Sequence, residues 1–269
     1  MRKQPLRIAL VGWGAINRRV AELLSLRVPE QVTIVAVGER DATLAIAAPP
    51  GARILTSPDG LAGLDLDLVL EAASREAVAL WCELALRHVP AVVVASTSAF
   101  CDTELLERLL RTADDHGSQL ILPPGALGGI DALSAASALE LDNVVHRIVK
   151  PPPAWRGTLA ESLTTLENLT HAVTFYVGTA REAAAKFPKN ANATVITALS
   201  GLGLDKTRVE LAADPDAREN VHLLSVTGAF GALEVRIENR ALADNPKSSE
   251  MAALSLVRII ENRIRALVC

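Results

Sequence analysis

The feature that most constrains the fold is a pair of glycines between an apolar run and a helical pattern. In the segment LRIALVGWGAINRR, residues 6–19, the apolar run ends at Gly12, Gly14 follows, and a helical pattern begins with Ala15 and Ile16. A strand, a tight glycine turn and a helix in this order present backbone N–H groups and a helix N-terminus to a pyrophosphate. Glycine supplies the backbone freedom of the turn and leaves room for the phosphate. We therefore predict that these four residues bind a dinucleotide cofactor.

Two further positions bear on the cofactor. Asn17 stands where the fingerprint G-x-G-x-x-G has its third glycine. We expect it to add bulk where helix and strand pack closely, so that the cofactor sits further out or binds more weakly. Glu39 follows an apolar run at residues 32–37, and an acid there accepts hydrogen bonds from the adenosine ribose, which favours NAD. A solvated loop carboxylate is the alternative, and Arg40 could neutralise a 2′-phosphate, so the cofactor is NAD or NADP.

Strands and helices alternate through the first half of the chain. The expected strands are residues 8–11, 32–37, 53–55, 66–70, 91–95 and 118–122, and the expected helices are residues 15–26, 75–87 and 102–115, the last capped by Asp102. This alternation implies βαβ units and a parallel sheet. Small and hydroxyl residues follow two of the strands, at residues 72–74 and 96–98, where ligands bind in such sheets. Residues 1–124 are therefore predicted to form a Rossmann dinucleotide-binding domain.

The pattern changes after a hinge-like stretch at residues 123–129. Strand-like runs at residues 144–149, 173–177, 209–213, 222–227 and 233–237 alternate with few helices, at residues 131–139, 182–186 and 191–199. Several strands with few crossovers are typical of a mixed sheet in an α+β domain. We predict an α/β protein in which residues 125–245 form an α+β substrate domain. Residues 246–269 then supply a C-terminal helix, at about residues 249–266, that packs back on the first domain.

Composition excludes several classes of protein. The 269 residues are half apolar and carry a formal net charge of −4, which argues against a general nucleic-acid binder. Three widely spaced cysteines indicate neither a disulfide framework nor a metal site, and a reducing cytoplasm is the natural location. No apolar run is long enough to span a bilayer, and no histidine pair has metal-ligand spacing. We expect no metal, no membrane partner and no nucleic acid.

Polar residues in the second half allow two interpretations each. His222 shares a strand face with Leu224 and Val226, which is typical of a satisfied core histidine but also suits a catalyst. Asn190 or Asn192 could cap a helix or hydrogen-bond a nicotinamide or a substrate carboxylate.

These residues lie in segments through which the sequence resembles the L-aspartate dehydrogenase family, from end to end. The matching segments are GWGAINR at residues 12–18, GALGGIDAL at 125–133, KPPPAW at 150–155, FYVGTAREA at 175–183, PKNAN at 188–192, SGLGLD at 200–205, ADPDARENVH at 213–222, GAFG at 228–231 and NPKSS at 245–249. One departure is STSAF at residues 96–100, which replaces an expected S-V-G-A-L and loses a glycine beside the nicotinamide.

The resemblance implies NAD(P)-dependent oxidative deamination of L-aspartate to oxaloacetate and ammonia through iminosuccinate, a precursor for pyridine nucleotides. It also implies a homodimer, a catalytic role for His222, and NAD contacts at Ala126 and Asn192. A histidine that titrates near neutrality could deprotonate both the substrate ammonium and the water that adds to the imine.

The substrate's two carboxylates need cations or hydroxyls. The candidates are Lys150, Lys189, Lys247, Ser248 and Ser249. The alternatives to this function are a related dehydrogenase of another small amino or keto acid and a non-catalytic nucleotide-binding sensor.

Overall fold

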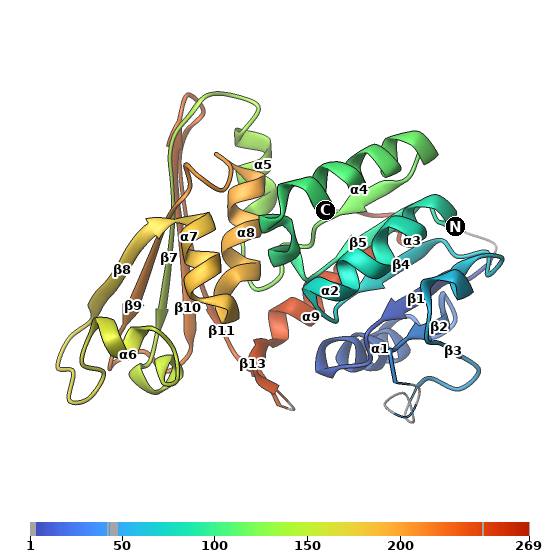
Figure 1. Cartoon of the computed structure of the whole chain (residues 1–269), viewed down its shortest axis with the longest axis horizontal. Coiled ribbons are helices and arrows are strands. Elements are labelled where there is room, and N and C mark those ends of the chain that lie inside the picture. Colours follow the sequence, from blue (N-terminus) through green and yellow to red (C-terminus); the bar gives the residue numbers. More distant parts are fainter. Residues whose placement is uncertain (1–3, 42, 44–47, 244, 269) are drawn as a thin grey trace. The chain divides into compact units, whose positions relative to one another are not determined.

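The protein is described from a computed structural model, which defines residues 4–41, 43, 48–243 and 245–268. The chain divides into two compact units (Figure 1). The first contains residues 1–125 together with residues 252–269, and the second contains residues 126–251.

The first unit is built on a six-stranded sheet in which every neighbouring pair is parallel. Its order is β3 (Arg53–Leu55), β2 (Val32–Gly38), β1 (Leu6–Val11), β4 (Leu68–Glu71), β5 (Ala91–Val94) and β6 (Gln119–Ile121). The strand order reverses between β1 and β4, and ligands of such sheets bind at this switch point, beyond the carboxyl ends of the strands. The predicted Rossmann fold is confirmed.

The helices of this unit follow the predicted pattern with one correction. They are α1 (Ala15–Arg27), α2 (Arg75–Ala77), α3 (Glu83–His88) and α4 (Thr103–His116), with short 3-10 turns at η2 (Pro58–Leu61) and η4 (Thr97–Cys101). Asp102 caps α4 as predicted, because its carboxylate accepts a hydrogen bond from the Leu105 N–H. The single helix expected over residues 75–87 is wrong in its middle. A π-helical turn, η3 (Val78–Cys82), joins α2 to α3 and brings Trp81 against Gly38, where a Cβ would lie 2.8 Å from the indole.

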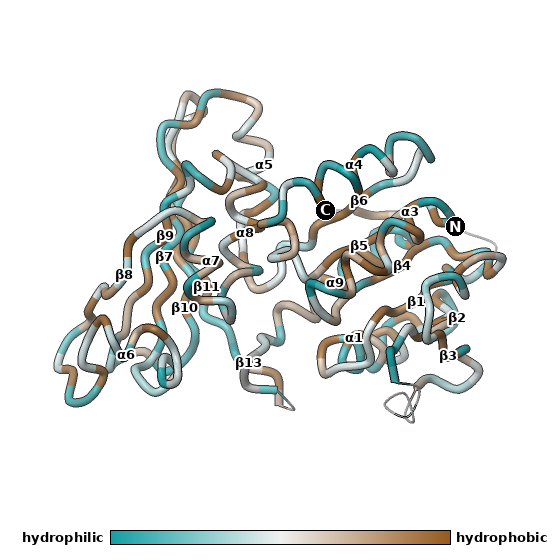
Figure 2. The backbone as a smooth tube through the Cα atoms, in the orientation of Figure 1, coloured by the Kyte–Doolittle hydropathy of each residue, from teal (hydrophilic) through white to brown (hydrophobic). Residues whose placement is uncertain are grey.

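The core of the first unit includes the C-terminal helix α9 (Glu250–Glu261). Its buried residues Ala253 and Leu256 share one hydrophobic cluster with Ile8 and Leu10 of β1. Figure 2 shows β1, β4 and β5 largely brown, as expected for strands that helices cover on both faces. The helix ends at Glu261 and not near residue 266, and residues 245–249 form a strand before it.

The second unit is built on a five-stranded mixed sheet, as predicted. Its order is β11 (Gly231–Asn239), β10 (Asn220–Gly228), β7 (Leu141–Lys150), β9 (Arg208–Ala213) and β8 (Val173–Thr179), and the pair β7–β9 is parallel while the others are antiparallel. The helices α5 (Ile130–Ala136), α7 (Ala180–Lys186) and α8 (Ala191–Ser200) lie over this sheet (Figure 1). The remaining elements are η5 (Pro152–Trp155), α6 (Ala160–Leu163), η6 (Pro188–Asn190) and a small hairpin of β12 (Ala241–Leu242) and β13 (Asn245–Ser249).

Candidate functional site

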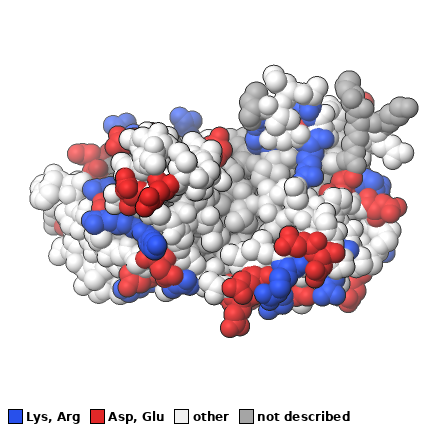
Figure 3. Space-filling model, turned by 90° about the horizontal axis from the view of Figure 1, so that it is seen from above, with Lys and Arg blue, Asp and Glu red and all other residues white. Residues whose placement is uncertain are grey.

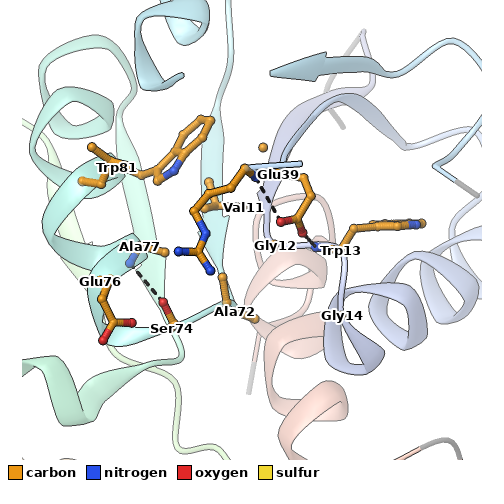
Figure 4. Close-up of a pocket in the computed structure, with 14 residues that line it drawn as sticks. Val11, Gly12, Trp13, Gly14, Glu39, Ala72, Ser74, Glu76, Ala77 and Trp81 are labelled. Atoms are coloured by element: carbon orange, nitrogen blue, oxygen red, sulfur yellow. Dashed lines mark hydrogen bonds between the residues drawn. The ribbon is translucent and has the colours of Figure 1, made fainter. Parts of the chain in front are cut away.

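A cavity of about 320 Å³ lies at the switch point of the first unit's sheet. Its walls come from the turn after β1, the end of β2, the residues after β4 and the π-helical turn, as Figure 4 shows. Gly12 has φ +86°, and a Cβ there would lie 2.6 Å from the Cβ of Ala73, so only glycine fits. The predicted glycine turn therefore lines a cavity of the size that small-molecule sites occupy.

The start of α1 is suited to an anion. Gly14 occupies the N-cap position, no side chain caps the helix, and its first turn has no acid. A Cβ on Gly14, which lines the cavity, would meet no protein atom within 4 Å. The N–H groups of a helix N-terminus attract a phosphate, so the residues present fit a dinucleotide pyrophosphate. Ala15 and Ile16 lie in this first turn.

Glu39 is oriented by the glycine turn. One carboxylate oxygen accepts a hydrogen bond from the Trp13 N–H at 3.0 Å, and the other accepts one from the Arg40 N–H at 3.0 Å (Figure 4). Glu76 lies on the cavity wall with Ser74, and a hydrogen bond with the Ser74 side chain lowers the pKa of Glu76. The lining also includes Arg40, so the described residues of the cavity wall carry two acids and one cation.

Asn17 has a structural role that we did not expect, because its amide forms hydrogen bonds with the glycine turn. Its side chain is fully buried, and its Nδ2 donates hydrogen bonds to the carbonyl of Val11 at 3.0 Å and to that of Gly12 at 2.7 Å. The amide thus ties the first turn of α1 to the end of β1. The predicted weakening of cofactor binding stays a prediction.

Glu71 is a buried residue that binds two lining residues of the cavity, Ala73 and Ser74, and sequence reasoning missed it. It ends β4, is 0% exposed, and accepts hydrogen bonds from the N–H groups of Ala73 at 2.7 Å, Ser74 at 3.0 Å and Ser96 at 3.1 Å. The Ser96 hydroxyl donates a fourth, at 2.9 Å. Burial raises the pKa of Glu71, while these hydrogen bonds oppose that rise. The carboxylate therefore holds together the two strand-end loops that the sequence placed beside the cofactor. Ser96, the first residue of the STSAF segment, supplies two of the four donors.

The second unit holds the candidate catalytic histidine. His222 of β10 pairs with Ile148 of β7, so His146 and Lys150 are its two diagonal neighbours on the same face of the sheet. Nδ1 of His222 lies 3.0 Å from Nε2 of His146, and His146 is 0% exposed. His222 is 7% exposed, and its Nε2 has no hydrogen-bond partner among the residues that the structure describes.

The electrostatics of His222 correct one expectation. Burial, the neighbouring His146 and the Lys150 ammonium together hold the pKa of His222 well below its usual value. The imidazole is therefore neutral at neutral pH, and the expected titration near neutrality is wrong for the protein without substrate.

Lys150 and Asn190 form a polar pair in the same unit. Lys150 Nζ donates to Asn190 Oδ1 at 2.6 Å and lies 5.1 Å from the centre of the Trp155 ring. Asn190 occupies the N-cap position of α8, but its side chain does not cap the helix. The interpretation of Asn190 as a helix cap is therefore wrong, because the lysine takes its carbonyl oxygen.

The other predicted site residues lie in various elements of the second unit. The Ala126 carbonyl accepts a hydrogen bond from Nδ2 of Asn239 at 2.8 Å, and Asn192 is exposed on the first turn of α8. Ser248 accepts a hydrogen bond from Asn245 within β13. Ser249 ends that strand and directly precedes Glu250, the first residue of α9, so it lies at a helix start as we expected. Lys189 and Lys247 belong to η6 and β13, and their side chains lie outside the described residues.

Three further observations concern metal ions, membranes and surface charge. Among the described residues, no group of three His, Cys, Asp or Glu side chains could hold a metal ion. Within the same part of the chain, no helix has the length and apolar character needed to cross a membrane. On the face that Figure 3 shows, Lys and Arg side chains lie among Asp and Glu side chains.

Comparisons with known proteins agree with this geometry. A family model described as the NAD-binding domain of homoserine dehydrogenase matches residues 12–123, and one described as the C-terminal domain of aspartate dehydrogenase matches residues 131–263. These two family models, which match the two halves of the chain, define an oxidoreductase that uses a pyridine nucleotide. An L-aspartate dehydrogenase of Brucella anthropi is 52% identical over 97% of each chain, and one of Pseudomonas aeruginosa is 39% identical over 97% of this chain and 99% of its own. The chain belongs to the aspartate dehydrogenase family.

The fold itself has a counterpart among solved structures. The crystal structure of aspartate dehydrogenase from Thermotoga maritima matches with a TM-score of 0.78 and 24% identity, over 98% of this chain and 99% of that one. An archaeal homoserine dehydrogenase in complex with NADPH matches with a TM-score of 0.61 and 11% identity, over 96% of this chain and 97% of that one.

Proposed function

We propose that the protein catalyses the NAD(P)-dependent oxidative deamination of L-aspartate to oxaloacetate and ammonia, through iminosuccinate, and so feeds the synthesis of pyridine nucleotides. Membership of the aspartate dehydrogenase family supports the substrate. The observation that carries the mechanism is His222, a neutral imidazole beside the cation of Lys150, whose Nε2 has no hydrogen-bond partner in the described part of the chain.

When bound, the nicotinamide would accept the hydride from Cα of the substrate. Residues of the first unit would hold the cofactor. Gly12, Gly14, Ala15 and Ile16 would bind the pyrophosphate at the start of α1, and Glu39 would accept hydrogen bonds from the ribose. Ala126 and Asn192 are the positions at which we propose further NAD contacts.

His222 serves as the base in two steps. The substrate ammonium must lose a proton before its nitrogen lone pair can form C=N, and Nε2 of His222 takes that proton. The same atom, once it has released this proton, removes one from the water that attacks the imine carbon. Because the imidazole is neutral in the resting protein, it is in its basic form from neutral to alkaline pH.

Lys150 is the strongest of the candidates for binding a substrate carboxylate. Its ammonium faces the same side of the sheet as His222, and Asn190 holds it in place. Lys189, Lys247, Ser248 and Ser249 remain candidates for the second carboxylate.

The charges of the cavity support NAD over NADP. Glu39 and Glu76 place two carboxylates on a wall that has the single cation Arg40 among its described lining residues. A 2′-phosphate would face net negative charge there, whereas ribose hydroxyls can donate to Glu39. Titration with NAD⁺ and NADP⁺ by calorimetry tests this: Glu39→Gln should narrow the preference for NAD⁺, and an unchanged ratio of dissociation constants would contradict it.

The activity is tested by following NADH formation at alkaline pH with L-aspartate and a panel of other amino acids. Turnover with L-aspartate above the rest is expected. Turnover with another amino acid alone would favour the related dehydrogenase, and NAD binding without any turnover would favour the nucleotide-binding sensor.

The role of His222 is tested by His222→Ala, with His171→Ala as the matched control on an exposed histidine. General acid–base catalysis contributes about 10²- to 10⁴-fold, so His222→Ala should abolish turnover with little change in NAD affinity. Activity within about tenfold of wild type would place the base elsewhere. The homodimer and the cytoplasmic location stay predictions, and light scattering of the purified protein tests the first.

A further inference from the structure

Three buried side chains from three elements of the second unit form a continuous hydrogen-bonded row. His222 Nδ1 on β10 lies 3.0 Å from His146 Nε2 on β7, and His146 Nδ1 lies 3.1 Å from the Thr197 hydroxyl on α8. The same hydroxyl lies 3.0 Å from the carbonyl oxygen of Ala193 in its own helix. His146 and Thr197 are both 0% exposed, so water does not complete their hydrogen bonds.

The chemistry of these groups determines which group donates and which accepts in each hydrogen bond of the row. A carbonyl oxygen only accepts, so the single hydroxyl proton of Thr197 points to Ala193, and the hydroxyl oxygen accepts from His146. His146 is neutral, because burial lowers its pKa to about 4. A neutral imidazole has one N–H. That N–H is at Nδ1 of His146, and its Nε2 must accept.

We infer that His146 and Thr197 are positioning residues that hold His222 in the tautomer with its proton on Nδ1 and its lone pair on Nε2. This inference rests on the proposed role of His222 as the base. Nε2 is the ring nitrogen without a partner among the described residues, so the row leaves a proton acceptor at the nitrogen that is available to a substrate.

The row also serves the charged form of His222. When Nε2 takes a proton from the substrate ammonium, the ring becomes an imidazolium, and no other proton needs to move. Its Nδ1–H then donates a stronger hydrogen bond to the neutral Nε2 of His146. Burial, the Lys150 ammonium and a charged His146 all lower the pKa of His222 and so oppose this protonation. The neutral form of His146 instead offers the protonated ring a hydrogen-bond acceptor at 3.0 Å.

The reverse direction gives a different catalyst. If the Thr197 hydroxyl donated to His146, then His146 would donate to His222, and His222 would present an N–H at Nε2 in place of a lone pair. Such a ring could not accept a proton from the substrate at that atom. The two directions therefore differ in whether Nε2 of His222 carries a proton, and this can be measured without substrate or cofactor.

The first test is ¹⁵N NMR of the full-length protein labelled in its five histidines, without substrate and at pH 7.5. We expect a protonated Nδ1 and an unprotonated Nε2 for both His222 and His146, assigned with His146→Gln and His171→Gln variants. A protonated Nε2 on His222 would overturn the inference. Since no turnover is measured, this result is independent of whether L-aspartate is the substrate.

The second test is kinetic and uses the best amino-acid substrate found. His146→Leu removes the acceptor and should lower kcat by about 5- to 150-fold, which is what the loss of one buried hydrogen bond is worth. His146→Gln keeps an acceptor at the position of Nε2 and should recover most of the loss. Thr197→Val should lower kcat with little change in KM.

Thr194→Val is the matched control, because the Thr194 hydroxyl is buried on the same helix and, among the residues that the structure describes, bonds only to the Ala191 carbonyl. It should leave kcat unchanged. If His146→Leu does not fold, Thr197→Val and the NMR of the wild type decide the question. Equal kcat values for folded His146→Leu and His146→Gln, or for Thr197→Val and Thr194→Val, would refute the positioning role.

Discussion

Lowering the pH from 7 to 4 should destabilise the second unit, because two of its histidines are buried. In the unfolded chain a histidine has its ordinary pKa near 6.5, whereas burial lowers the pKa of His146 to about 4. Between these values the unfolded chain binds more protons than the folded protein. The free energy of unfolding therefore falls as the pH falls through this window and recovers as the pH rises.

The magnitude follows from the shift of His146. Each pKa unit corresponds to about 1.4 kcal/mol, so the change from 6.5 to about 4 is worth about 3 kcal/mol by pH 4. The pKa of His222 is lowered as well, which adds to the loss. For a protein whose total stability is about 5–15 kcal/mol, this is a large fraction.

The assay is urea unfolding at pH values from 7.5 to 4.5, followed by tryptophan fluorescence, for the wild type and His146→Gln. The glutamine does not titrate, so the free energy of unfolding of the wild type should fall relative to that of His146→Gln as the pH falls. Carboxylate titrations are common to both proteins and cancel in the difference. Parallel curves would refute the reasoning, because they would mean that His146 binds its proton equally in both states.

Three further predictions concern the first unit. Glu261→Gln should destabilise the protein by about 2 kcal/mol above pH 5, because hydrogen bonds from Arg27 lower the pKa of Glu261 to about 2. That difference from wild type should vanish in thermal melts as the pH falls from 4.5 towards 2, and a constant difference would contradict it. Asn17→Ala should raise the dissociation constant for NAD⁺ by about 3- to 10-fold in calorimetry, since the carbonyl of Gly12 loses its donor; unchanged affinity would show that the amide does not shape the turn. Glu71→Gln should weaken NAD⁺ binding and lower stability by about 1–3 kcal/mol, because an amide NH₂ must then face backbone donors, and wild-type values for both would refute the role of this carboxylate.

Local sequence signals predicted much of the first unit. The apolar runs, Gly12 and Gly14, and the cap at Asp102 act over a few residues, so their structural consequences can be deduced from spacing alone. They gave the parallel sheet, the glycine turn and the start of α4. The π-helical turn at residues 78–82 was not predictable, because it depends on Trp81 packing against Gly38, 43 positions earlier in the sequence.

The roles of Asn17 and Glu71 near the cofactor cavity could not be predicted from the sequence either. From the sequence, the first was a departure from a motif and the second was the end of a strand. In the structure, Asn17 binds carbonyl groups five and six positions earlier in the chain. Glu71 joins the nearby Ala73 N–H to that of Ser96, which comes close only when β4 and β5 align. Hydrogen bonds of this kind depend on directions that composition and periodicity do not contain.

The sequence by itself determined the two-part architecture and the glycine turn and, through its resemblance to a family, suggested His222 as the catalytic residue. Only the tertiary structure decided which residues surround that histidine. His146 and His222 are 76 positions apart, and the register that pairs His222 with Ile148 is set by the burial of whole strand faces. A shift of one residue would turn His146 to the opposite face of the sheet. The acceptor for His222 therefore exists only in the folded protein.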